Sequence, residues 1–146
     1  MPAAPIEHDG QLLDVAATVA LVATVRASVV RAASVALDEL ATALPEPIVS
    51  MSLRAWPLDF PADIAIQRHA PYQARADAIM YRQALAELAR VRDWRVHLYD
   101  AKDVESQAAG KLAERADEVL RGPRTRIGPP WTADHRRALA ATIMAG

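Results

Sequence analysis

The first half of the chain is dominated by one long stretch in which apolar residues recur every three to four positions. The repeating positions are Val15, Val19, Val22, Val25 or Arg26, Val29, Ala33, Leu37, Leu40 and Leu44. This spacing predicts a long N-terminal helix over residues 14–43, which Asp14 caps and which Pro45 and Pro47 end. Its first half is apolar on nearly every side, so we expect it to be buried all round or covered by a partner chain.

Two shorter patterns further along predict strands on either side of a second helix. Residues 48–53 alternate loosely, and residues 94–99 place Val96 and Leu98 on one face. Between them, residues 73–92 carry a helical repeat whose buried stripe consists of Ala76, Ile79, Met80, Ala84, Leu88 and Val91. The order of strand, long helix and strand predicts a βαβ unit, in which the two strands are parallel.

The remaining segments predict short helices and one long connection. Residues 54–72 hold several prolines and at most one helical turn, at 62–67; connections of this length are usually functional or poorly ordered. A third helix begins after Asp103 and runs through Val104, Ala108 and Leu112, and helix resumes over residues 113–121 until Gly122-Pro123. A loop over 124–130 then precedes a last helix, which Thr132 caps and whose core face is Leu139 and Ile143.

Near the N-terminus, Asp9-Gly10 between short apolar flanks predicts a β-hairpin. Together these elements predict an α/β fold: a small sheet with a parallel βαβ unit, flanking helices and the long N-terminal helix. The length of 146 residues predicts a single domain over residues 1–146.

Composition narrows the classes of function. A net charge of -1 gives no global attraction to nucleic acid or anionic lipid, although a local basic patch remains compatible with it. The absence of cysteine excludes disulfides, thiolate catalysis and cysteine-ligated zinc, and it fits a cytoplasmic protein. Residues 1–10 have neither the basic nor the apolar region of a signal peptide, and residues 15–25 are too short to span a bilayer before Arg26, so we expect no membrane partner.

Polar and aromatic residues gather where the two predicted strands end. Parallel sheets bind ligands just beyond the carboxyl ends of their strands, which makes this edge the expected ligand-binding site. Its candidate residues, with those of the long connection, are Arg54, Trp56, Arg68, His69, Tyr72, Tyr99 and Lys102. Asp100, Asp134 and His135 are the candidate catalytic acids and bases.

Several of these residues also have a structural interpretation. The Arg68-His69 pair is compatible with simple solvation, Trp56 with a loop anchor, and Asp100 and Asp134 with helix caps. The glycines form no phosphate-binding loop, the four histidines have no metal-binding spacing, and there is no GxSxG nucleophile motif. The pattern therefore predicts no metal site, and it leaves open whether the protein is an enzyme.

The order of elements over about residues 37–144 resembles the ribonuclease H-like fold, and more narrowly the Holliday-junction resolvases of the RuvC type. The segments that carry the resemblance are Pro47-Ile48-Val49-Ser50-Met51-Ser52, the helix over 76–89, the strand and cap over 94–104, and the terminal Trp131-Thr132-Ala133-Asp134-His135-Arg136-Arg137-Ala138-Leu139-Ala140-Ala141. The resemblance implies DNA cleavage with divalent metal, such as Mg²⁺, held by four carboxylates.

Most of those carboxylates are missing from this chain. Asp134 matches the first acid of the family's last helix, but Arg137 stands where the second would be. The strand acid falls near Ser52, and only Glu7 or Asp9 could supply the acid of the first strand. The resemblance thus implies the fold without the nuclease mechanism.

Three functions follow from these patterns. The first is a non-catalytic or catalytically altered ribonuclease H-like domain that binds nucleic acid or a phosphorylated ligand at the strand ends, through Arg54, Arg68, Arg75 and Lys102. The second is an interaction protein whose apolar helix, over residues 15–30, forms a homodimer or binds a partner. The third is a small-metabolite enzyme that uses Asp100, Asp134 or His135 as acid or base.

Overall fold

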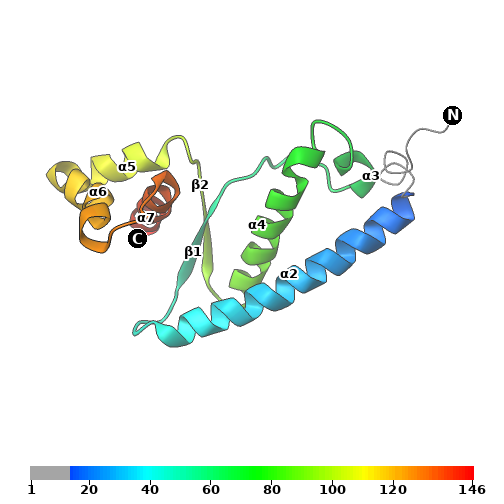
Figure 1. Ribbon diagram of the computed structural model, residues 1–146, viewed down its shortest axis with the longest axis horizontal. Helices are drawn as coiled ribbons and strands as arrows, with labels where there is room; N and C mark the ends of the chain where they lie inside the picture. The colour runs from blue at the N-terminus through cyan, green and yellow to red at the C-terminus, as the bar shows by residue number, and fades with distance from the viewer. Residues whose placement is uncertain (1–13) are drawn as a thin grey trace. The chain divides into compact units, whose positions relative to one another are not determined.

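The computed structural model describes residues 14–146, and the chain is mostly helical. Its elements in order are α2 (Val15–Ala43), β1 (Ser50–Arg54), α3 (Ile64–Gln67), α4 (Gln73–Val91), β2 (Arg95–Tyr99), α5 (Val104–Leu112), the 3-10 turn η1 (Ala113–Arg115), α6 (Ala116–Ile127) and α7 (Ala133–Ala145) (Figure 1). The hairpin predicted at Asp9-Gly10 lies outside the described residues.

The prediction of an α/β, ribonuclease H-like fold is wrong. The described residues are 67% helical, and the sheet that they form has only two strands. Two five-residue strands cannot form the central layer that an α/β fold packs its helices on. The helices α5, α6 and α7 instead build a core among themselves, while the expected long N-terminal helix is present as α2.

The described residues form two compact units, which we describe separately. Unit 1 consists of α2 with Trp56–Leu85, and unit 2 consists of Leu44–Ala55 with Ala86–Gly146. Helix α4 begins in unit 1 and ends in unit 2. The single domain expected from the chain length stays a prediction.

Helix α2 has almost the predicted bounds. The Asp14 side chain caps it, because its Oδ1 accepts a hydrogen bond from the Ala17 N–H at 2.7 Å. Although α2 has 29 residues, Leu37 is the one residue in it that is buried. Its large exposed apolar residues are Val15, Val19, Leu21, Val25, Val35 and Leu40. The described residues therefore leave much of this apolar helix uncovered.

In unit 2, β1 and β2 pair in parallel, which confirms the predicted βαβ unit. The register places Met51 beside Val96 and Leu53 beside Leu98 on one face of the sheet. The opposite face pairs Ser52 with His97, and Ser52 Oγ lies 3.2 Å from His97 Nδ1. The sheet thus has one apolar face and one polar face.

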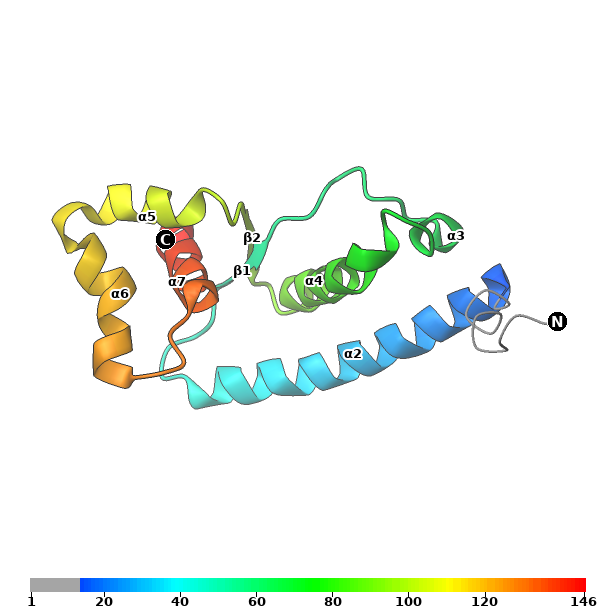
Figure 2. The ribbon, with the colours of Figure 1, turned by 45° about the horizontal axis from the view of Figure 1, so that its top comes forward.

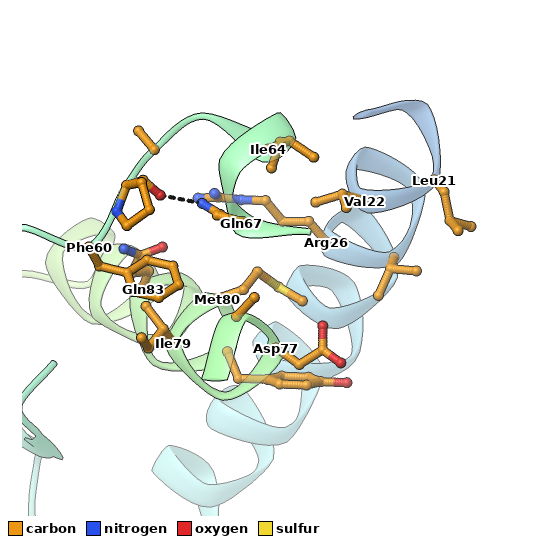
Figure 3. Close-up of a pocket in the computed structure, with 15 residues that line it drawn as sticks. Leu21, Val22, Arg26, Phe60, Ile64, Gln67, Asp77, Ile79, Met80 and Gln83 are labelled. Atoms are coloured by element: carbon orange, nitrogen blue, oxygen red, sulfur yellow. Dashed lines mark hydrogen bonds between the residues drawn. The ribbon is translucent and has the colours of Figure 1, made fainter. Parts of the chain in front are cut away.

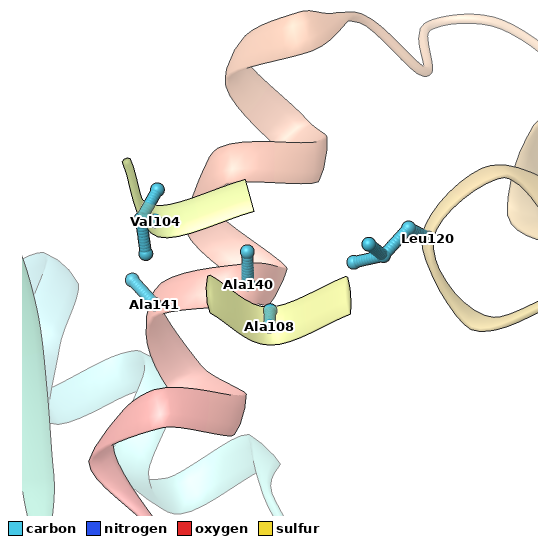
Figure 4. Packing of buried hydrophobic residues seen from close by; sticks show 5 residues of the cluster. All are labelled: Val104, Ala108, Leu120, Ala140 and Ala141. Carbon is cyan, nitrogen blue, oxygen red and sulfur yellow. The ribbon is translucent and has the colours of Figure 1, made fainter. Parts of the chain in front are cut away.

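The core of unit 2 lies between α5, α6 and α7, which form a small helical cluster (Figure 2). Its buried members are Val104, Ala108, Leu120, Ala140 and Ala141 (Figure 4). The predicted core residues Leu139 and Ile143 pack around this cluster but are only partly buried. Because alanine side chains are short, α5 and α7 can pack closely at this point.

Two predictions about helix boundaries and faces were wrong. Helix α6 does not stop at Gly122-Pro123 but continues to Ile127, so most of the loop predicted over 124–130 is helical. Proline removes one backbone hydrogen bond from a helix, and here the ring of Pro123 is buried beside Leu120 on the inner face of α6, which offsets that loss. Val91 is 80% exposed instead of buried, because α4 ends there.

The alanine contact between α5 and α7 predicts that unit 2 tolerates no larger residue there. Ala140 has no exposed surface, so Ala140→Leu should lower the free energy of unfolding by about 1–3 kcal/mol through overpacking. Ala138→Leu adds the same atoms at an exposed position of α7 and serves as the control. Urea denaturation measures both variants, and equal stabilities would contradict this packing.

Candidate functional site

Four of the predicted site residues lie together at the carboxyl ends of the strands in unit 2. Arg54 and Tyr99 are paired across the sheet, and the Ala55 N–H donates to the Tyr99 carbonyl at 2.8 Å. Immediately after β2, Asp100 Oδ1 accepts a hydrogen bond from the Lys102 N–H at 2.8 Å. The parallel register brings these residues to one edge, as the sequence pattern predicts.

The other four predicted ligand-binding residues, Trp56, Arg68, His69 and Tyr72, belong to unit 1. Tyr72 packs edge-on against Phe60, with ring centroids 5.8 Å apart, and Arg68 Nη1 donates to Thr18 Oγ1 at 3.4 Å. The His69 carbonyl accepts the Tyr72 N–H. The predicted set is thus divided between the two units.

The three candidate catalytic residues have structural contacts near helix starts. Asp134, whose side chain is 92% exposed, pairs with Arg137 one turn later in α7 at 3.2 Å. The His135 Nδ1 accepts the Thr132 N–H at 3.2 Å, and its ring packs on Trp131. Asp100 turns the chain into α5, as described above. Caps and first-turn carboxylates account for these positions.

No group of three or more histidine, aspartate or glutamate side chains within residues 14–146 is arranged to hold a metal ion.

A groove between α5, α6 and α7 is lined by a cluster of charged side chains. This α5–α6–α7 groove has a volume of about 540 Å³. Lys102, Arg121 and Arg136 line it, together with the carboxylates of Glu105 and Asp117. Arg136 Nε lies 2.9 Å from Glu105 Oε1, and Arg121 Nη1 lies 3.4 Å from Asp117 Oδ1. Three cations against two carboxylates leave the groove with an excess positive charge.

A second cavity, the α2–α4 pocket, lies within unit 1. It has a volume of about 500 Å³ and is bounded by α2, the segment from Phe60 to Gln67, and α4 (Figure 3). Val22, Ile64 and Met80 are among its apolar lining, and Arg26 and Asp77 also line it. Gln67 Nε2 donates to the Pro61 carbonyl at 2.6 Å, which fixes the amide at the wall.

A stripe of exposed residues along α2 is the third feature, and two of its members, Leu21 and Val25, also line the α2–α4 pocket. Leu21, Val25, Ser28, Ala32 and Val35 are all exposed and follow alternating steps of four and three residues, and we call them the α2 stripe. By length and composition alone, α2 is also the one helix in the described residues that is long and apolar enough to cross a membrane. An exposed apolar surface of this kind marks a binding surface.

Sequence reasoning identified Lys102 but missed most of these residues. Arg121 and Arg136 approach Lys102 only because α6 and α7 fold back on α5. Arg26 was detectable, because it interrupts an apolar run of α2 with a cation. Asp77 and Gln67 carry no comparable signal, since polar residues are ordinary at the surface of α3 and α4.

Comparison of the chain with protein-family models, with curated proteins and with solved structures finds no match.

The Arg136–Glu105 pair links α7 to α5 and should be worth more than the surface pair Arg121–Asp117. The side chains of the first pair are 25% and 28% exposed, and those of the second are 66% and 85% exposed. A double-mutant cycle with Glu105→Ala and Arg136→Ala should give a coupling energy of about 1 kcal/mol, against about 0.5 kcal/mol or less for Arg121 and Asp117. Equal couplings would show that burial does not strengthen the pair.

Proposed function

We propose that this protein is an assembly protein that pairs through the α2 stripe with α2 of a second copy of the chain. The observation that carries the proposal is the exposure of the stripe, whose apolar members Leu21, Val25 and Val35 lie on a helix with one buried residue. Covering such a surface removes apolar area from water, at roughly 25 cal/mol per Å². The sequence pattern predicts that this helix is buried or covered by a partner chain, and the proposal names a second copy of the chain as that partner.

The spacing of the stripe supports a helix as the partner. Leu21, Ser28 and Val35 recur every seven residues, and Val25 and Ala32 lie between them in the same repeat. This is the spacing by which two α-helices pack along each other, each side chain entering a space between four residues of the other helix. Ser28 and Ala32 are small and central, so the two backbones can approach closely there.

The charges of α2 favour a protein partner over a bilayer. Arg26 and Arg31 both lie within the apolar half of the helix. A membrane-spanning orientation would place them in hydrocarbon, at about 2.5–3.5 kcal/mol for each arginine near the centre of a span. Neither arginine is a member of the stripe, and a helix–helix contact along it leaves both at its edge, where Arg31 Nη2 donates to Ser28 Oγ at 3.3 Å.

Two copies offer each other the same surface, which supports self-association. In a two-fold dimer one patch is used twice, so a single stripe is sufficient to form a closed assembly. Such pairing covers both stripes at once and leaves neither exposed. A different partner would leave the stripe exposed whenever that partner was absent.

Val35→Glu places a charge in the stripe and should convert a dimer into a monomer. Val35 is 57% exposed and lies outside the α2–α4 pocket, so the free chain should still fold. Val19→Glu is the matched control, because Val19 is 44% exposed on the same helix but off the stripe. Sedimentation equilibrium of the three proteins at micromolar concentrations measures the effect.

Three outcomes contradict the pairing. In the first, the unchanged protein sediments as a monomer. In the second, Val19→Glu dissociates the dimer as completely as Val35→Glu does. In the third, the protein floats with lipid vesicles and Val35→Glu prevents flotation, which would assign the stripe to a bilayer.

A second candidate function is binding of a phosphorylated small molecule in the α5–α6–α7 groove. The excess of cations around Lys102 supports it, as does the size of the groove, which lies within the usual range for small-ligand sites. Arg136 and Arg121 present planar guanidinium groups that suit phosphate oxygens. In this proposal the anion binds residues of unit 2 alone, and of the ligand-binding residues predicted at the strand ends only Lys102 lines the groove.

Pyrophosphate is the probe for this groove. Lys102→Gln should weaken its binding about fivefold, as expected for one partly solvated charge worth about 1 kcal/mol. Arg115→Gln removes an exposed charge that does not line the groove and should leave binding unchanged. Calorimetric titration at low and moderate salt measures both. Equal losses in the two variants, or binding indifferent to salt, would refute a specific phosphate site.

A further inference from the structure

We propose that the α2–α4 pocket of unit 1 binds an aliphatic monocarboxylate, with the carboxylate at Arg26 and the apolar chain among Val22, Ile64 and Met80. The site shares Leu21 and Val25 of its lining with the α2 stripe, and it is separate from the groove of unit 2. It rests on the size of the cavity, the apolar character of its walls and the position of its charges.

The cavity suits a small ligand with an apolar body. Its volume of about 500 Å³ lies within the usual range for small-molecule sites. Figure 3 shows the Met80 side chain extending from α4 toward α2, with Ile64 of α3 above it. These side chains offer no hydrogen-bonding partner except the weak thioether acceptor, so the part of the ligand that contacts them is hydrocarbon.

The polar end of the site is formed by Arg26 and Gln67. In Figure 3 the Arg26 side chain runs from α2 toward Gln67, and Arg26 is partly buried. A guanidinium has five N–H donors, so it can hold a carboxylate in a bidentate pair while it keeps contacts within the protein. Gln67 is fixed by its bond to the Pro61 carbonyl, which keeps this end of the pocket in one arrangement.

Asp77 makes the site selective for a single negative charge. It lines the same pocket, on the other side of Met80 from Gln67 in Figure 3. A ligand with a carboxylate at each end would bring its second charge toward Asp77, and like charges at close range are repelled. A monocarboxylate ends there in a methyl group, which is not repelled.

Octanoate is the probe that tests the site, with octanedioate and 1-octanol as comparison ligands. Isothermal titration calorimetry should show octanoate binding at least tenfold more tightly than either. Octanedioate adds a charge near Asp77, and 1-octanol lacks the carboxylate that pairs with Arg26. Equal affinity for octanoate and 1-octanol would overturn the assignment of the head group.

Arg26→Gln should weaken octanoate binding about tenfold or more, since a hydrogen bond to a charged group contributes about 1.5–3 kcal/mol. Arg31→Gln is the matched control, because Arg31 is an arginine of the same helix that does not line the pocket. Asp77→Asn should raise the affinity for octanedioate and leave that for octanoate nearly unchanged. An equal effect of Arg26→Gln and Arg31→Gln would overturn the proposal.

A variant that blocks the cavity tests its location independently. Ala62 lines the pocket and is exposed, so Ala62→Trp adds bulk at the rim without disturbing the core. It should abolish octanoate binding while the far-ultraviolet circular dichroism stays that of the unchanged protein. Full binding by this folded variant would place the ligand elsewhere and overturn the proposal.

Discussion

The constraint on which unit 1 depends is the amount of apolar surface on α2. A helix of 29 residues with so many valines, leucines and alanines exceeds what α3 and the first part of α4 can cover, and the described residues bury only Leu37 of it. The uncovered surface takes two forms: a pocket against α4, and an exposed stripe that shares Leu21 and Val25 with the lining of that pocket. Both proposals for unit 1 follow from this excess, because covering exposed apolar surface with a complementary surface lowers the free energy of the protein in water.

Unit 2, in contrast, buries its apolar helix faces against one another by means of small residues. Ala108, Ala140 and Ala141 let α5 and α7 pack closely, and Leu120 of α6 closes the cluster. This packing brings Arg136 of α7 beside Glu105 of α5 and sets both near Lys102. The charge of the groove is therefore a consequence of the alanine contacts.

Polar residues that suggest chemistry in a sequence are often required by the backbone. Asp134 and His135 stand in the first turn of α7, where the helix dipole favours the Asp134 carboxylate and His135 Nδ1 accepts the Thr132 N–H. Asp100 likewise accepts a backbone hydrogen bond, from the Lys102 N–H in the turn before α5. Arg26, by contrast, interrupts an apolar helix and is needed by no cap, which makes it the more informative polar residue.

The sequence by itself determined the elements that depend on neighbours along the chain. The start of α2 at Asp14 and the start of α7 after Thr132 follow from local capping, and the parallel pairing of β1 and β2 follows from the length of the helix between them. Tertiary structure decided the rest. Helix α6 passes through Pro123 because burial beside Leu120 outweighs a local signal. Residues 14–146 are mostly helical because they form a sheet of only two strands. The predicted strand-end residues fall into two units because Trp56, Arg68, His69 and Tyr72 belong to unit 1. These outcomes depend on contacts between residues that are distant in sequence. The energies of such contacts cannot be predicted from the pattern of neighbouring residues.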